Sequence, residues 1–361
     1  MSEKSFKFRN IDDFVPGRFE QMGMLKGKRW YTEMATEDRD GKLGLFKPQR
    51  KEFGDKKVFC GNHYGEFIGY VAATCVDVPV CKVELAHLSK YYENIHKARH
   101  HGTPESKDGC ISFAEKSLDQ ELEHGTSVID FFRYQNPEEF ERITKNDSRN
   151  TDRNDNLEVC LAAIEYRIRR FLGDHKDCPA HYIDKKVREN RALAIQMIVY
   201  DCMYGNNDRH DENWAMIKDR YGRDISLYKL YDNERVFGLY ENQNFIEKAI
   251  ATNTVEETSE IALFSRMHIP GATKKHSSYK EVLTYIMDNY TAETKQALSN
   301  YFDRDTQFLL QSFLKSCEGL PDCYIEFQRQ MYKARYDFAK GLYLSKSALS
   351  HTEERENEET R

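Results

Sequence analysis

Residues 205–213 (GNNDRHDEN) form an almost wholly polar segment between two stretches that should be buried. Before it, residues 190–203 are rich in leucine, isoleucine, methionine and valine, which predicts a buried helix. Gly205 is suited to end that helix in a left-handed conformation. After it, residues 214–217 and 226–231 are typical of two strands joined by a turn. We therefore expect a loop held between a helix and a hairpin, with the rest of the chain as its scaffold.

The predicted hairpin brings a second polar position to this loop. A turn centred on Gly222 would place Asn213 and Asp232 opposite each other at the open end. Paired positions put their Cβ atoms about 5 Å apart, so an amide oxygen and a carboxylate there can share a cation. Asp208 lies in the same loop as Asn213.

These three residues match what phosphoryl transfer requires. That reaction uses a carboxylate to orient and deprotonate the attacking hydroxyl, and an Asn and an Asp to hold Mg²⁺ on the nucleotide phosphates. Mg²⁺ prefers a few protein oxygens together with substrate phosphates. Asp208, Asn213 and Asp232 fit in residue type, spacing and hairpin context. The alternative is a polar surface loop in which the two aspartates cap neighbouring elements.

A lysine near the end of an apolar strand is a second candidate feature. Residues 43–48 (LGLFKP) predict a short strand, and an inward-facing Lys47 would need an anionic partner. Glu66, at the start of the apolar helix-like run 66–75, can supply a carboxylate. Strands are predicted at 80–85 and 109–113, and this order of elements is the layout of a kinase N-lobe. The alternatives are a surface lysine and a glutamate favoured by the helix dipole.

A short glycine-containing segment precedes the strand that carries Trp30. Gly27 and Lys28 are candidate phosphate-binding residues in 23–28, because glycines let backbone N–H groups approach phosphate and lysine adds charge. A basic β-turn explains the same residues equally well.

Composition limits the remaining possibilities. The chain has 361 residues and a formal net charge of −6, with both signs interspersed, so no nucleic-acid partner is expected. Its nine cysteines include no C-x-x-C pair and suggest reduced thiols. The sequence shows neither a signal peptide nor a membrane span. We expect a cytoplasmic protein, and secretion as an effector without a signal stays open.

Beyond the central loop, one helix is predicted at 128–140 and another at 157–172, with helices again from 279 onward. Residues 233–238 are interpreted as the start of an activation segment, and 244–276 as a region that can present substrate. The expected fold is α+β, a two-lobe protein-kinase-like fold. It has a small β-rich N-lobe at 1–117, a larger, mostly helical C-lobe at 118–345, and a disordered tail at 346–361.

The motifs resemble those of the HipA-like serine/threonine kinases, in particular the compact branch that includes the cell-translocating kinases. The pattern G-N-x-D-R-H-x-x-N stands at 205–213, and Y-D-N follows at 231–233. The resemblance implies that Asp208 is the catalytic base and that Asn213 and Asp232 bind Mg²⁺. It also implies that Lys47 binds the nucleotide phosphates with Glu66 as its helix partner, and that 23–28 replaces the phosphate-binding loop.

The resemblance implies an ATP- and Mg²⁺-dependent kinase that phosphorylates Ser or Thr of a protein substrate and itself. The chain lacks the G-x-G-x-x-G, H-R-D, D-F-G and A-P-E motifs of eukaryotic kinases and the long N-terminal extension of the founding toxin. Two alternatives stay open, a phosphatidylinositol 4-kinase-like lipid kinase and a nucleotide-binding pseudokinase or interaction module. Residues 112–115 are predicted to contact adenine. The physiological substrate and the oligomeric state do not follow from the sequence.

Overall fold

The computed structural model describes residues 7–19, 28–34, 41–49, 61–89, 106–117, 119–147, 153–174, 178–258, 264–271, 276–302, 304–317 and 319–359. Gly27 and the rest of the predicted phosphate-binding segment 23–27 lie outside these residues. Within the described part of the chain, no helix is long and apolar enough to cross a lipid bilayer.

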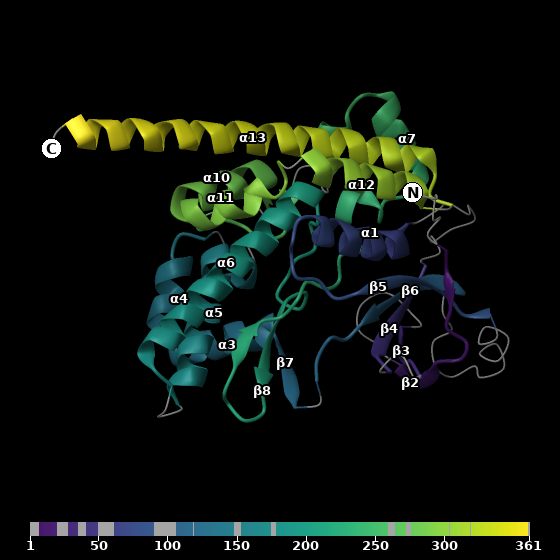
Figure 1. Ribbon diagram of the computed structural model, residues 1–361, viewed down its shortest axis with the longest axis horizontal. Helices are drawn as coiled ribbons and strands as arrows, with labels where there is room; N and C mark the ends of the chain where they lie inside the picture. The colour runs from purple at the N-terminus through teal and green to yellow at the C-terminus, as the bar shows by residue number, and fades with distance from the viewer. Residues whose placement is uncertain are drawn as a thin grey trace.

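The first part of the chain forms a six-stranded sheet with one helix packed on it (Figure 1). The strand order is β1-β5-β6-β4-β3-β2. The bounds are β1 Arg9–Asn10, β2 Val15–Phe19, β3 Arg29–Thr32, β4 Leu43–Pro48, β5 Val83–His87 and β6 Asp108–Phe113. The β1–β5 pair is parallel and the others are antiparallel. The predicted strand at 43–48 is confirmed without a change of bounds.

Helix α1, Asn62–Cys75, lies between this sheet and helix α12 (Figure 1). It begins four residues earlier than the predicted helical run at 66–75. Its first residues, Asn62 and His63, are polar but buried, so the hydrophobic pattern did not reveal the true start. Glu66 therefore stands in the second turn, within the lobe interface.

The second part of the chain is mostly helical (Figure 1). Its helices are α3 Gly125–Gln135, α4 Pro137–Thr144, η1 Arg153–Asp155, α5 Leu157–Gly173, α6 Ala180–Tyr204, η2 Val236–Gly238, α7 Gln243–Ala251, α8 Val255–Thr258, α10 Tyr279–Asn289, α11 Thr291–Ser299, α12 Arg304–Ser316 and α13 Asp322–Glu359. A three-stranded sheet has the order β7-β8-β9, formed by β7 Gln120–His124, β8 Ala215–Asp219 and β9 Ile225–Leu227. A two-stranded pair consists of β10 Phe264–Ser265 and β11 Ser277–Ser278. The result is the expected two-lobe α+β kinase-like fold.

Two expectations differ from the structure. The single helix predicted at 128–140 is two helices, α3 and α4, because Pro137 cannot continue α3 and instead opens α4 at its first position. The tail predicted as disordered at 346–361 is helical as far as Glu359. Alanine, leucine, lysine and glutamate are strong helix formers, so α13 can continue by propensity into this polar stretch. The lobe boundary at 117/118 stays a prediction.

One hydrophobic core runs through both parts of the chain. It joins α1 to α6 and α13 and includes Tyr200, Tyr204, Phe237 and Phe327, which are fully buried. The polar loop thus follows directly on the buried C-terminal half of α6.

Candidate active site

The loop 205–213 begins where the sequence predicted. Gly205 ends α6 with φ 71° and ψ 32°, in the left-handed region, and its N–H donates to the carbonyl of Asp201. The residues that follow turn away from the helix axis toward strand β8. The predicted helix, left-handed cap and polar loop are all present.

The predicted register of the hairpin is wrong. The turn closes on Asp219 N–H to Asp224 O at 3.0 Å, and Lys218 pairs with Ile225. This centres the hairpin between Tyr221 and Gly222 rather than just after Gly222. Strand β9 also ends at Leu227, so the ladder never reaches Asn213 and Asp232.

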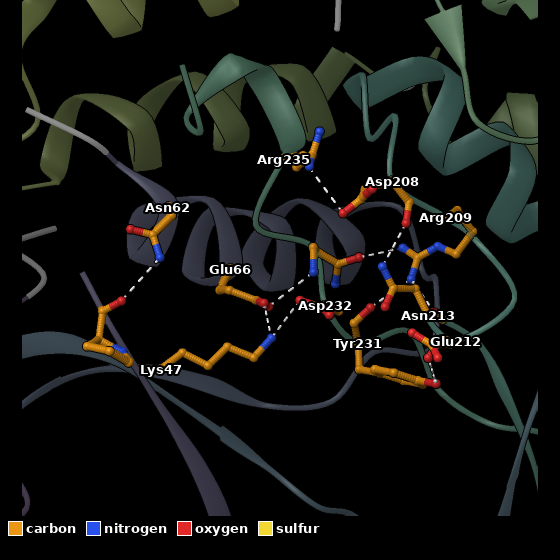
Figure 2. Close-up of polar contacts among 12 residues, drawn as sticks. Lys47, Asn62, Glu66, Asp208, Arg209, Glu212, Asn213, Tyr231, Asp232 and Arg235 are labelled. Atoms are coloured by element: carbon orange, nitrogen blue, oxygen red, sulfur yellow. Dashed lines mark hydrogen bonds and ion pairs between the residues drawn. The ribbon is translucent and has the colours of Figure 1, made fainter. Parts of the chain in front are cut away.

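Arg209, rather than the hairpin, joins the polar loop to the Asp232 segment. Its side chain is buried, and each of its five N–H groups meets an acceptor. Figure 2 shows the side that faces Asn213 and Tyr231. Nε and Nη2 donate to the two carboxylate oxygens of Asp201 at 3.0 and 3.1 Å. Nη1 donates to the carbonyls of Asn213 and Tyr231, both at 2.7 Å, and Nη2 also to Asn233 Oδ1 at 2.7 Å. One guanidinium therefore joins helix α6, the polar loop and the Asp232 segment.

Asp208 and Asn213 are held to each other inside the loop. Asn213 Nδ2 donates to the main-chain oxygen of Asp208 at 2.7 Å, which fixes the amide. The Asp208 carboxylate faces Arg235, with Oδ2 3.1 Å from Nε. The Asp208 side chain is 21% exposed, so the carboxylate is anchored yet open to an incoming molecule.

Lys47 bridges two carboxylates across the lobes (Figure 2). Its Nζ donates to Glu66 Oε1 on α1 and to Asp232 Oδ1 at 2.8 Å. The other Glu66 oxygen, Oε2, accepts the N–H of Asn233 at 3.1 Å. The expected Lys47–Glu66 pair is therefore present, and the same carboxylate also ties α1 to the Asp232 segment.

Two glycines on α1 allow that close approach. A Cβ at Gly65 would stand 2.1 Å from the carbonyl oxygen of Glu234, and one at Gly69 would stand 2.7 Å from Asn233 Cβ. Because Gly65 and Gly69 have no side chains, residues 233–234 can pack directly against this face of α1. Asp232 itself has φ 56°, a left-handed conformation that aspartate tolerates better than most residues.

The charged groups of the site shift one another's pKa values. Burial raises the pKa of Glu66 above its usual value, against the opposing effect of Lys47. Despite its burial, the pKa of Asp232 is lowered, because Lys47 and Lys28 stabilise its charged form. The same carboxylates raise the pKa of the buried Lys47. Lys28 therefore lies within electrostatic reach of Asp232, as a phosphate-binding residue would.

The donor set suits a hard cation. Glu66, Asp232 and Glu234 each offer an oxygen, and these oxygens lie within 4.8 Å of one another. Oxygen ligands without sulfur or imidazole fit Mg²⁺. The structure thus adds Glu234 as a candidate metal ligand beside the predicted Asn213 and Asp232. The sequence feature that could have indicated it is an acidic residue two positions after Asp232. The metal-binding roles of Asn213 and Asp232 stay predictions.

In the strand connection at 112–115, where adenine contacts were predicted, three backbone N–H groups already have acceptors. The N–H groups of Phe113, Ala114 and Glu115 donate to Lys82 O, Leu43 O and Tyr228 Oη, at 2.9, 2.8 and 2.9 Å. An adenine contact through these three N–H groups would require the present hydrogen bonds to break.

Comparisons with known proteins give structural matches. No protein-family model matches the chain, and no curated protein matches its sequence significantly. The crystal structure of the proinflammatory kinase CtkA of Helicobacter pylori matches with TM-score 0.67 and 13% identity, over 94% of this chain and 99% of CtkA. A Shewanella oneidensis MR-1 structure of the toxin–antitoxin system HipA, HipB and operator DNA matches with TM-score 0.49 and 10% identity, over 92% of this chain and 73% of that chain.

CtkA is similar to this chain over nearly its whole length. At 13% identity the likeness concerns the fold. The chain therefore has the two-lobe fold of the HipA-like kinases that its motifs resemble.

Proposed function

We propose that this protein is a kinase that uses ATP and Mg²⁺ to phosphorylate Ser or Thr hydroxyls of a protein substrate, and of itself. The observation that carries the proposal is the Lys47 bridge between Glu66 and Asp232. It lies beside a loop whose Asp208 and Asn213 are fixed to the same Asp232 segment through Arg209. A lysine, two metal-type ligands and an accessible carboxylate at one site are the parts that phosphoryl transfer needs.

Each residue has a defined task in this proposal. Lys47, steadied by Glu66, donates to the nucleotide phosphates, and Asn213 and Asp232 would hold Mg²⁺. When bound, Mg²⁺ neutralises charge on the phosphate oxygens. Asp208 orients the acceptor hydroxyl and takes its proton as the oxygen attacks the γ-phosphorus. Because the protein supplies no covalent intermediate, rate acceleration depends on positioning and electrostatics.

The test is phosphate transfer itself. Purified protein is incubated with ATP and Mg²⁺, and intact mass and phosphopeptides are measured. Wild type is compared with Asp208→Asn, Asp232→Asn and, as a matched control, Asp337→Ala on the exposed face of α13. Wild type and control should gain phosphate on Ser or Thr. Each site variant should lose about 10²-fold or more in rate while staying folded.

Other outcomes would point elsewhere. Wild-type turnover in Asp208→Asn or Asp232→Asn would refute the assignment of those residues. Phosphate transfer only to phosphoinositide vesicles would identify a lipid kinase. Nucleotide binding without transfer to either would identify a binding module. Unchanged ATP affinity and rate in Lys47→Ala would move the phosphate-binding lysine elsewhere, with Lys28 the first candidate.

A further inference from the structure

Arg235 contacts the carboxylate of Asp208, the group that accepts the hydroxyl proton in the proposed function. Its Nε lies 3.1 Å from Asp208 Oδ2, as Figure 2 shows above the Lys47 bridge. Arg235 comes three residues after Asp232, so the segment that supplies a proposed metal ligand also supplies a cation for the proposed base. The motif resemblance gives this arginine no role.

The backbone of Arg235 is fixed on both sides. Before it, Asn233 is held by Glu66 through its N–H and by Arg209 through its side chain. After it, Phe237 is fully buried and lies 4.9 Å from the ring of Tyr204, between centroids. The position of the Arg235 backbone is therefore set by buried contacts on both sides of it.

The guanidinium is fixed as well. Its Cζ lies 4.5 Å from the centroid of the Tyr240 ring, which restricts the plane of the group. The side chains of Arg235 and Asp208 are 26% and 21% exposed, and ion pairs in contact with water add little to stability. An arginine with both its backbone and its guanidinium fixed contributes more to the placement of a carboxylate than to the stability of the fold.

We propose that Arg235 is a positioning residue for Asp208, and this inference rests on the proposed function. Arg235 holds the carboxylate by Oδ2, so that Oδ1 can meet the acceptor hydroxyl. It also offsets the repulsion between Asp208 and the nucleotide phosphates, since a carboxylate beside several phosphate charges is otherwise unfavourable.

The chemical step balances without any change in Arg235. The hydroxyl proton moves to Asp208 while the hydroxyl oxygen bonds to the γ-phosphorus. The bond from that phosphorus to its bridging oxygen breaks, and ADP leaves with the electron pair. Arg235 exchanges no proton and forms no covalent bond, so its effect appears in the rate constant of this step rather than in nucleotide binding.

The experiment measures kcat and the KM for ATP in wild type, Arg235→Ala and Arg235→Lys. Arg223→Ala, at the exposed β8–β9 turn, is the matched control. We expect kcat of Arg235→Ala to fall about 10- to 100-fold, because a misplaced catalytic group has costs of that order. The KM for ATP should stay within about 3-fold. Arg235→Lys and added guanidinium ion should each restore part of kcat, which a purely structural role would not predict.

A second pair of measurements isolates the contact. In an Asp208→Asn background, Arg235→Ala should cause little further loss, because the group it positions is already disabled. Tyr240→Phe keeps the ring and should retain kcat, whereas Tyr240→Ala should lower it. Unchanged or increased kcat in Arg235→Ala would overturn the inference, and an increase would instead indicate an autoinhibitory contact. A wild-type protein without phosphotransfer would fail the proposed function first, before any variant is compared.

Discussion

Replacing Arg209 with methionine, alone and together with a change at Asp201, should separate stability from activity at this site. In the native protein the guanidinium satisfies five acceptors, including both carboxylate oxygens of Asp201. Arg209 is 2% and Asp201 5% exposed. Removing one partner of a buried ion pair leaves the other charge uncompensated and costs about 3–5 kcal/mol of unfolding free energy. We expect Arg209→Met to lose that amount and all measurable phosphotransfer.

The double variant Asp201→Leu/Arg209→Met is the decisive protein to compare. It removes the uncompensated buried charge, so part of the lost free energy should return, although the acceptors that Arg209 satisfied stay without a donor. Activity should not return, because the carbonyls of Asn213 and Tyr231 still lack their donor. Urea unfolding followed by fluorescence gives the free energies, and phosphopeptide yield gives activity. Arg329→Met, whose partner Glu326 lies on the exposed face of α13, serves as the control and should change neither.

Recovery of both stability and phosphotransfer in the double variant would refute this reasoning. It would mean that the polar loop and the Asp232 segment hold their positions without the arginine. Wild-type stability in the single variant would refute the premise that the ion pair is buried and needed.

Two further predictions concern α1. Gly65→Ala should abolish phosphotransfer while the protein stays folded, because its Cβ would stand 2.1 Å from Glu234 O; Gly341→Ala, with nothing within 4 Å, is the control and should keep full activity. Burial lowers the pKa of His63 to about 3, so the unfolded chain binds a proton below about pH 6.5 that the folded chain does not. Unfolding free energy should therefore fall by about 1.4 kcal/mol per pH unit as pH drops from about 6.5 toward 3. Urea unfolding of His63→Phe should lack this component of the slope, and an identical slope in both proteins would contradict the assignment to His63.

The sequence was informative where a local signal determines the structure. The left-handed Gly205 and the strand Leu43–Pro48 follow from residue type and hydrophobic pattern, and both are present. The position of Lys47 opposite Glu66 followed from the cost of burying an unpaired lysine, and the structure has that pair.

Features that depend on distant parts of the chain were not predicted. The hairpin register was wrong because the Asp219–Asp224 hydrogen bond places the centre of the turn one residue earlier than predicted, and no pattern in the sequence specifies that choice. Arg209 belongs to the G-N-x-D-R-H-x-x-N pattern, yet its role requires knowing that three separate segments meet at one guanidinium. Glu234 enters the site only because Gly65 lets its backbone approach α1.

Both carboxylates of the proposed reaction already lie beside a cation in this structure, Asp232 beside Lys47 and Asp208 beside Arg235. An ammonium group has three donors, and Lys47 uses two of them on Glu66 and Asp232. One donor therefore remains for a phosphate, and a second becomes available only if Asp232 turns toward a metal ion. Nucleotide and metal binding should then strengthen each other through Lys47, because each favours the same rearrangement.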